Sequence, residues 1–192
     1  MDRKAPDAVI QGAVQCAPVL AGIKPSNLLI LEKADHHIAE RLIEETGLSC
    51  EFLYAGKSRA VYLVYREEEL AGILEDCSRQ AFLRRLGYQS MNTESVLSRL
   101  KKRCKGYSKG KTEYPHELGI LLGYPLGDVI GFIVHRGKDF IFSGYWKVYE
   151  NEAAARETFE KYHYCRREAR KMACQGKGFR ELRRAFAGVM TA

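Results

Sequence analysis

The sequence predicts an α+β protein: a single domain, residues 1–192, in which a small sheet of three or four strands packs against several helices. Two observations support this class. Stretches with helical apolar spacing alternate with short runs of β-branched and aromatic residues. The order of these elements lacks the regular strand–helix alternation of a doubly wound sheet. The length also allows one domain with a real hydrophobic core.

The first third of the chain predicts a helix, a strand, a second helix and a hairpin. Residues 5–15 have the pattern of a short amphipathic helix. The following "CAPVLAGIKPSN" contains two prolines and one glycine, and is predicted to be irregular. Residues 28–33 form a candidate strand, and residues 34–47 have helical spacing that ends at a glycine. "SCEFLYAGKSRAVYLVYRE" is typical of a β-hairpin with a short loop.

Helices dominate the rest of the chain. Residues 67–87 have helical spacing, and a further helix is expected to begin at Asn92 or Thr93 as its N-cap. Residues 140–150 are the last candidate strand, interrupted by a glycine. A long helix follows Asn151, and a final short helix lies in a basic C-terminal helical tail, residues 165–192.

The stretch "PHELGILLGYPLGDVIGFI" predicts a helix-turn-helix-like pair over residues 115–136. Proline suits the first turn of each helix, and Gly123 supplies the stop between them. An apolar stripe on the second helix is expected to face the core; it comprises Leu126, Val129, Ile130 and Ile133. The start of that helix offers no Arg, Lys, Asn or Gln to read base edges, which argues against sequence-specific DNA recognition.

Four glycines in this stretch stand four residues apart: Gly119, Gly123, Gly127 and Gly131. Glycine inside a helix costs up to about 1 kcal/mol relative to alanine. Such spacing therefore suggests the close approach of another backbone or of a ligand, and helices of this kind could also form a protein-interaction face. The alternative is that Gly123 is a cap and the others have no common role.

The net charge of +7 and the pI near 9.1 raise the possibility of a nucleic-acid partner. The basic residues concentrate in two segments, 99–111 and 165–186, which could form one patch or two. Tyr107, Tyr162 and Tyr164 could stack on bases. The candidate phosphate-binding residues are Lys101, Lys102, Arg103, Lys105, Arg166 and Arg167.

The six cysteines contain no CxxC pair, so the spacing predicts no zinc site and favours reduced, mostly buried thiols. Cys16 is the candidate nucleophile because its segment is predicted to be a loop. His116 would act as its base, and Glu117 or Asp128 would orient the imidazole. The function that we expect first is thus a thiol/histidine site for hydrolytic, redox or metal chemistry. The alternative is a non-catalytic basic module that binds nucleic acid or protein.

Three segments carry a resemblance to a known family: "CAPVLAGIK", "PHELGILLGYPLGDVIGFI" and "GYWKVYENEAAARETFEKYHYC". Together they resemble an uncharacterised bacterial family, domain of unknown function 3793, found mainly in anaerobic Gram-positive bacteria. The resemblance extends from about Cys16 to Cys165 and implies no reaction, cofactor or fold. The recurring sequence motifs of this family suggest further binding residues: Lys24, Tyr124, Trp146, Lys147 and Tyr149. The sequence departs from them at Val19, where threonine is usual, and at Gly127, where an acidic residue is common.

The apolar runs are far shorter than the roughly 20 residues that span a bilayer. The N-terminal residues do not resemble a signal peptide, because polar and acidic residues interrupt the apolar stretch. We therefore expect a cytoplasmic protein with no membrane partner. The sequence indicates no particular cofactor, and "AGKSRA" lacks the earlier glycine and the context of a phosphate-binding loop.

Overall fold

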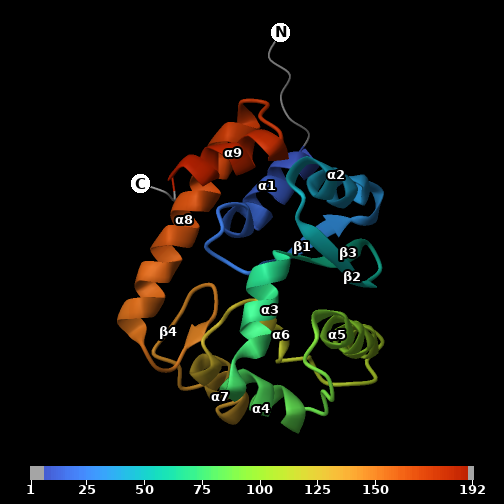
Figure 1. Cartoon of the computed structure of the whole chain (residues 1–192), viewed down its shortest axis with the longest axis vertical. Coiled ribbons are helices and arrows are strands. Elements are labelled where there is room, and N and C mark those ends of the chain that lie inside the picture. The colour runs from blue at the N-terminus through green and yellow to red at the C-terminus, as the bar shows by residue number, and fades with distance from the viewer. Residues whose placement is uncertain (1–6, 190–192) are drawn as a thin grey trace. The chain divides into compact units, whose positions relative to one another are not determined.

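The computed structural model describes residues 7–189, and the side chains up to residue 187. The predicted α+β class is confirmed, because these residues contain a three-stranded antiparallel sheet, a two-stranded hairpin and helices (Figure 1). The domain consists of two compact units. Unit 1 combines the described residues up to Glu67 with those from Tyr162 onward, and unit 2 spans Glu68–Lys161.

Unit 1 holds the sheet, whose strand order is β1-β3-β2 with antiparallel neighbours. The predicted strand at 28–33 and the predicted hairpin are both confirmed, and Gly47 ends the second helix in the left-handed conformation at φ +65°. The elements of unit 1 are α1 (Asp7–Leu20), β1 (Ser26–Glu32), η1 (Lys33–Asp35), α2 (His37–Thr46), β2 (Ser49–Ala55), β3 (Arg59–Tyr65), the second half of α8 (Glu152–Cys174) and α9 (Phe179–Val189).

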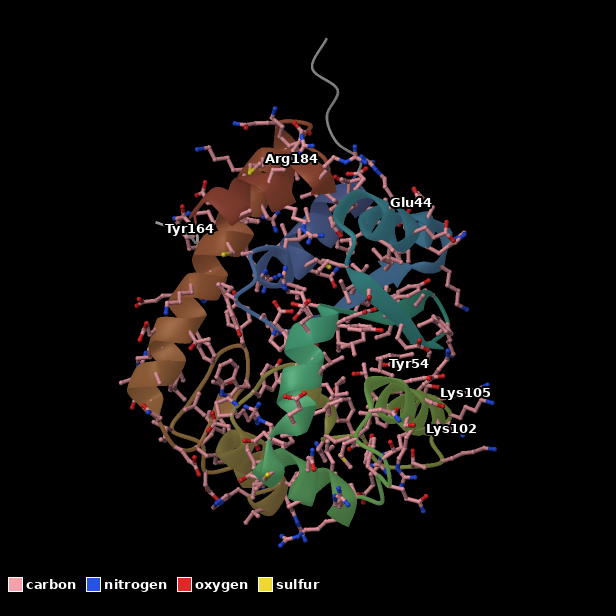
Figure 2. All side chains as sticks on the ribbon, viewed as in Figure 1. Glu44, Tyr54, Lys102, Lys105, Tyr164 and Arg184 are labelled. Carbon is pink, nitrogen blue, oxygen red and sulfur yellow. The ribbon has the colours of Figure 1, made fainter. Side chains whose placement is uncertain are left out.

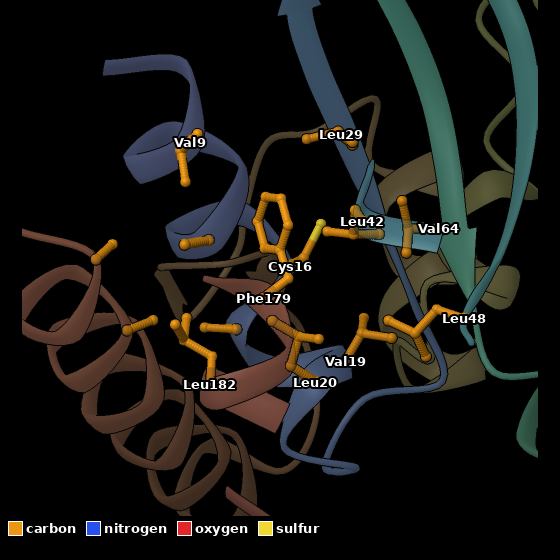
Figure 3. Close-up of a cluster of buried hydrophobic side chains, with 14 of the residues drawn as sticks. Val9, Cys16, Val19, Leu20, Leu29, Leu42, Leu48, Val64, Phe179 and Leu182 are labelled. Atoms are coloured by element: carbon orange, nitrogen blue, oxygen red, sulfur yellow. The ribbon is translucent and has the colours of Figure 1, made fainter. Parts of the chain in front are cut away.

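The core of unit 1 lies between the sheet and the helices α1, α2, α8 and α9 (Figure 3). Phe179, Leu29 and Leu42 are fully buried there. The segment predicted as a basic tail contributes to this core, because its apolar residues face inward while most of its cations are exposed. The residues that it contributes are Cys165, Ala169, Ala173, Phe179, Leu182 and Phe186.

The prediction of an irregular segment over residues 16–27 is correct for residues 21–25 but wrong for its beginning, because α1 continues through Cys16, Ala17 and Pro18 to Leu20. Proline lacks the amide hydrogen that would donate to the preceding turn. The helix nevertheless persists, and the amide of Ala21 donates to the Ala17 carbonyl at 2.9 Å. Nearly every residue of its second half is buried, so apolar contacts outweigh the one lost hydrogen bond.

Unit 2 is mainly helical. The stretch 67–87, predicted as continuous helical territory, is two helices, because the Asp76 side chain accepts from the Arg79 amide at 2.8 Å and caps the second. The predicted caps Asn92 and Asn151 are confirmed. The elements of unit 2 are α3 (Glu67–Glu75), α4 (Cys77–Arg85), α5 (Thr93–Ser108), α6 (Leu118–Leu121), α7 (Leu126–Val134), β4 (Phe142–Ser143), β5 (Lys147–Val148) and the first turns of α8.

The helix-turn-helix-like pair is present as α6, a single turn, followed by α7, and Gly123 joins them at φ +77°. The predicted buried stripe on α7 is only partly correct. Val129 is buried, but Ile130 is 39% exposed and Ile133 is 37% exposed. The glycine side of α7, not its apolar stripe, meets the segment 146–150.

Close packing explains two of the four spaced glycines. A Cβ on Gly131 would lie 2.6 Å from the first ring carbon of Tyr149, and one on Gly119 would lie 2.9 Å from a methyl group of Val129. At Gly127 a Cβ would overlap the carboxylate of Glu150, which is the mobile end of an exposed side chain. The glycine of α7 that is tightly packed, Gly131, therefore meets a side chain of another segment of unit 2, and not the backbone or ligand that the spacing suggested.

These contacts predict that Gly131→Ala destabilises the protein and that Gly127→Ala does not. The methyl group added by Gly131→Ala must displace the ring of the packed Tyr149 from its Cγ outward, which costs about 1–3 kcal/mol. Gly127→Ala needs only a rotation of Glu150, and the gain in helix propensity of up to about 1 kcal/mol offsets it. Urea unfolding of both variants checks this, and equal losses of unfolding free energy would contradict it.

Candidate functional site

Cys16, the predicted nucleophile, lies in the core of unit 1 with no exposed surface. Figure 3 shows its sulfur beside the side chains of Leu42 and Phe179. Burial raises the pKa of the Cys16 thiol, with a smaller contribution from Cys50. The thiol is therefore held in its protonated form, which is the opposite of what a nucleophilic cysteine requires.

His116, the predicted base, belongs to unit 2, whereas Cys16 belongs to unit 1. The imidazole is half-buried between aromatic rings, 5.5 Å from the centroid of Tyr114 and 5.3 Å from that of Phe132. The adjacent Glu117 contacts other groups. The structure thus gives His116 an aromatic environment, and its action as a base stays a prediction.

Glu117 is 1% exposed and forms a buried ionic cluster in unit 2. Its carboxylate accepts two hydrogen bonds from Arg103, through Nε and through Nη2 at 3.3 Å, and one from the Tyr88 hydroxyl at 3.0 Å. These three donors compensate the charge that burial would otherwise destabilise. Burial, with a smaller contribution from the negative charge of Glu117, raises the pKa of Tyr88 and raises that of Cys104 to about 11. Cys104 is thus another unreactive thiol.

Asp128 is the second buried carboxylate of unit 2, at 3% exposed. It accepts from the indole Nε1 of Trp146 at 2.6 Å and from the backbone amides of Tyr149 and Glu150 at 2.7 and 3.2 Å. Tyr124 stacks on Trp146 with ring centroids 4.9 Å apart. The structure therefore gathers around α7 four residues from the recurring motifs of the family, and they hold the helix against the segment 146–150. These residues are Tyr124, Asp128, Trp146 and Tyr149.

Two further features surround these residues. A small cavity of about 140 Å³ is lined in part by Asp128, Trp146 and Glu150. Lys147 donates from Nζ to the carbonyl of Gly137 at 2.6 Å and lies 4.7 Å from the ring centroid of Phe140. The carboxylate oxygens of Asp128 and the ammonium of Lys147 thus have partners within the fold, which fits structural roles.

Lys24 is the buried cation of unit 1, at 3% exposed. Its Nζ donates to Oδ1 of Asn27 at 2.5 Å and lies 5.6 Å from the ring centroid of Tyr162. Asn27 is itself fixed, because its amide nitrogen donates to the Gln15 carbonyl at 2.7 Å. Burial lowers the pKa of Lys24 to about 7; nearby Arg166 lowers it further and Cys16 opposes the shift. Tyr162 is buried beneath this amine, so its predicted stacking on bases is wrong.

The two predicted basic segments fall in different units, and their cations have different partners. Arg103 is committed to Glu117. In unit 1, Arg167 lies 3.4 Å from Glu168 and stacks on Tyr164. Lys102 and Lys105, in contrast, are exposed on α5 and extend outward from it (Figure 2). Four exposed lysines of the basic segment 99–111 form no ion pair with the described residues. They are Lys102, Lys105, Lys109 and Lys111.

Two exposed tyrosines lie at the C-terminal end of this basic segment. Tyr107 is 42% exposed and Tyr114 is 39% exposed, and their rings meet edge to face with centroids 5.2 Å apart. Sequence reasoning identified Tyr107 but missed Tyr114. A tyrosine within the polar run "KGKTEYPHE" was the available signal, since a linker cannot bury an aromatic ring by itself.

The described residues give little support to other classes of site. All six cysteines are free thiols; three are buried, Cys50 is half-buried, and Cys77 and Cys174 are exposed. Between residues 7 and 187, no three His, Cys, Asp or Glu side chains lie close enough together to hold a metal ion. None of the described helices has the length and apolar character needed to cross a bilayer.

The environment of Cys16 predicts its behaviour toward thiol reagents. In the native protein at pH 6, Cys16 should react more slowly than free cysteine, because burial disfavours the thiolate. Cys77 and Cys174 should label first, and Cys16 should label fully only in denaturant. Peptide mass mapping after timed alkylation measures this, with a Cys77→Ser/Cys174→Ser variant to isolate the buried thiols. Native labelling of Cys16 faster than free cysteine would instead support the thiol/histidine site.

Lys24 predicts a pH dependence of stability. Its folded pKa of about 7 lies below the ordinary 10.5, so the unfolded chain binds more protons between these values. Stability contributed at this position therefore rises with pH through that window, by up to about 1.4 kcal/mol per unit. Urea unfolding at pH 6 to 9 should show that the unfolding free energy of the wild type rises with pH relative to that of Lys24→Met. Lys33→Met, at an exposed position, is the control. If the unfolding free energies of the wild type and Lys24→Met change with pH in parallel, the lowered pKa of Lys24 is contradicted.

Comparison with known proteins places the chain in a family without assigning a reaction. No curated protein and no solved structure matches the sequence. A family model matches residues 13–183, which extends beyond Cys165 and includes most of the basic C-terminal segment that we expected to lie outside the resemblance. Since this match covers most of the chain, the protein belongs to the family described as protein of unknown function, DUF3793.

Proposed function

We propose that unit 2 binds single-stranded nucleic acid without sequence specificity, through α5 and the loop that follows it. Proteins of this kind combine cations that contact phosphates with aromatic rings on which bases stack. The observation that carries the proposal is the pair of exposed, touching tyrosines, Tyr107 and Tyr114, at the end of a helix on which two exposed lysines, Lys102 and Lys105, form no ion pair with the described residues.

The charge distribution supports this choice of surface. Some exposed cations elsewhere in the described chain are paired with acidic residues, as in Arg156–Glu152 and Lys161–Glu157, whereas others, such as Lys57 and Lys171, form no ion pair. Lys102 and Lys105 on α5 and Lys109 at its C-cap follow one another at three- and four-residue spacing without such partners. Unpaired lysines repel one another, and a polyanion that neutralises them releases its own counterions.

The aromatic arrangement supports bases as the second contact. The loop between the two tyrosines carries Lys109 and Lys111, with Glu113 as its one acidic residue. The Lys111 amide donates to the Gly106 carbonyl at 3.0 Å, so the loop folds back on the end of α5. This brings Tyr114 to Tyr107 and leaves parts of both rings open to solvent.

Sequence-specific reading is not part of the proposal. The beginning of α7 presents Leu126, Gly127 and Asp128, and the carboxylate of Asp128 is occupied by Trp146. Base edges are read by donors and acceptors that project from such a helix. Thiol/histidine chemistry remains a prediction from the sequence, and the buried, protonated state of Cys16 gives it no support.

The test is fluorescence anisotropy of labelled oligothymidine and oligouridine titrated with the full chain at several salt concentrations. We expect binding that weakens with salt, with a logarithmic slope of about −0.7 per phosphate neutralised. Tyr107→Ala should weaken binding roughly tenfold, because each stacked base contributes about 1–3 kcal/mol. Tyr107→Phe should retain it, since the ring is kept.

Matched controls come from unit 1 and from α8. Tyr164→Ala removes an equally exposed tyrosine, at 43%, and Lys161→Ala removes an exposed lysine that is paired with Glu157. Neither should change affinity by more than about twofold. Absence of binding at low salt, or equal losses for Tyr164→Ala and Tyr107→Ala, would exclude the proposal.

A further inference from the structure

The first turns of α5 form a second feature of unit 2, a shallow groove with a volume of about 390 Å³. Two cations, Arg99 and Lys102, line it together with two hydroxyl residues, Ser95 and Ser98. Glu94 is the remaining lining residue, so the charges there sum to two positive minus one negative, or +1. The groove thus combines donors and positive charge on one helix.

Arg99 is held in position by its surroundings. Its Nη2 donates to the Leu86 carbonyl at 2.9 Å, and its guanidinium carbon lies 5.1 Å from the ring centroid of Tyr88. Gly87, at φ +82°, leaves room for it, since a Cβ there would come within 2.6 Å of Nη2. A guanidinium fixed in this way loses little conformational entropy when it binds a ligand.

Several hydrogen-bond donors that line the groove have no acceptor within the described part of the protein. Among the described residues Arg99 and Lys102 have no carboxylate within 4.0 Å. The Nε of Arg99 is buried without a hydrogen-bond partner. Neither serine hydroxyl forms a hydrogen bond within the described part of the chain. The Nε of Arg99 is enclosed, so an anion in the groove would meet the other donors, namely the rest of the guanidinium, the Lys102 ammonium and the two hydroxyls.

We propose that this groove binds a phosphate group of the nucleic-acid strand, an assignment that rests on the proposed function. A phosphate offers several oxygens in a tetrahedral arrangement, which suits a guanidinium, an ammonium and two hydroxyls acting together. A carboxylate has two oxygens in one plane and would leave some of these donors unused. Lys102 lies at the end of the groove, three residues before Lys105 along α5, so it links the groove to the lysines that precede Tyr107.

The first experiment titrates the full chain with inorganic phosphate, with acetate as the carboxylate probe, by calorimetry at low salt. Phosphate should bind and acetate should not. Lys102→Ala should weaken phosphate binding roughly tenfold, and Ser98→Ala by a smaller factor. Both residues are exposed, so these variants should fold even if Arg99→Lys does not. Lys57→Ala removes an exposed lysine of unit 1 outside the proposed surface; it is the matched control and should leave phosphate binding unchanged.

The second experiment separates free phosphate from strand phosphate as the ligand. Oligothymidine should displace inorganic phosphate, and Lys102→Ala should weaken the affinity for both. If oligothymidine fails to displace the bound inorganic phosphate, the assignment of the groove to a strand phosphate is overturned. Equal phosphate affinity in wild type, Lys102→Ala and Lys57→Ala would overturn the assignment of the groove as a phosphate site. Either result leaves the effect of Tyr107→Ala on oligothymidine binding as an independent measure of the proposed function.

Discussion

The ion pair between Arg103 and Glu117 is the interaction on which the proposed binding surface depends. It joins the middle of α5 to the residue just before α6, and so fixes both ends of the segment between them. That segment carries Tyr114, which must return to α5 to meet Tyr107. The carboxylate is buried and receives a third hydrogen bond from Tyr88, so the loop is anchored on its inner side while its lysines stay outside.

The cations of unit 2 consequently divide into two groups. Arg103 points inward and compensates a buried charge, whereas Lys102 and Lys105, its near neighbours, face solvent. Arg99 stands between these extremes, because protein contacts hold it while it lines an open groove. Neighbouring basic residues in one helix therefore perform different tasks, decided by the direction that the helix gives each side chain. A count of charges along the segment cannot separate them.

Local signals made much of the fold predictable. Asn92 and Asn151 cap helices because their side chains bond the amide three residues on, and Gly47 and Gly123 adopt left-handed turns that few other residues tolerate. Tertiary contacts decided the rest. Pro18 suggested a loop, yet burial on nearly all sides carries α1 past it, and this places Cys16 in the core. Likewise the pairing of Arg103 with Glu117 joins residues fourteen apart, which no local pattern reveals.

The composition of unit 1 from the two ends of the chain has a consequence for biosynthesis. Its sheet and first two helices are translated before unit 2, but their packing partners Phe179 and Leu182 are translated only after it. Unit 2, an uninterrupted stretch, is translated completely before them. Nascent unit 1 must therefore wait with apolar surface uncovered, a condition in which molecular chaperones are commonly engaged.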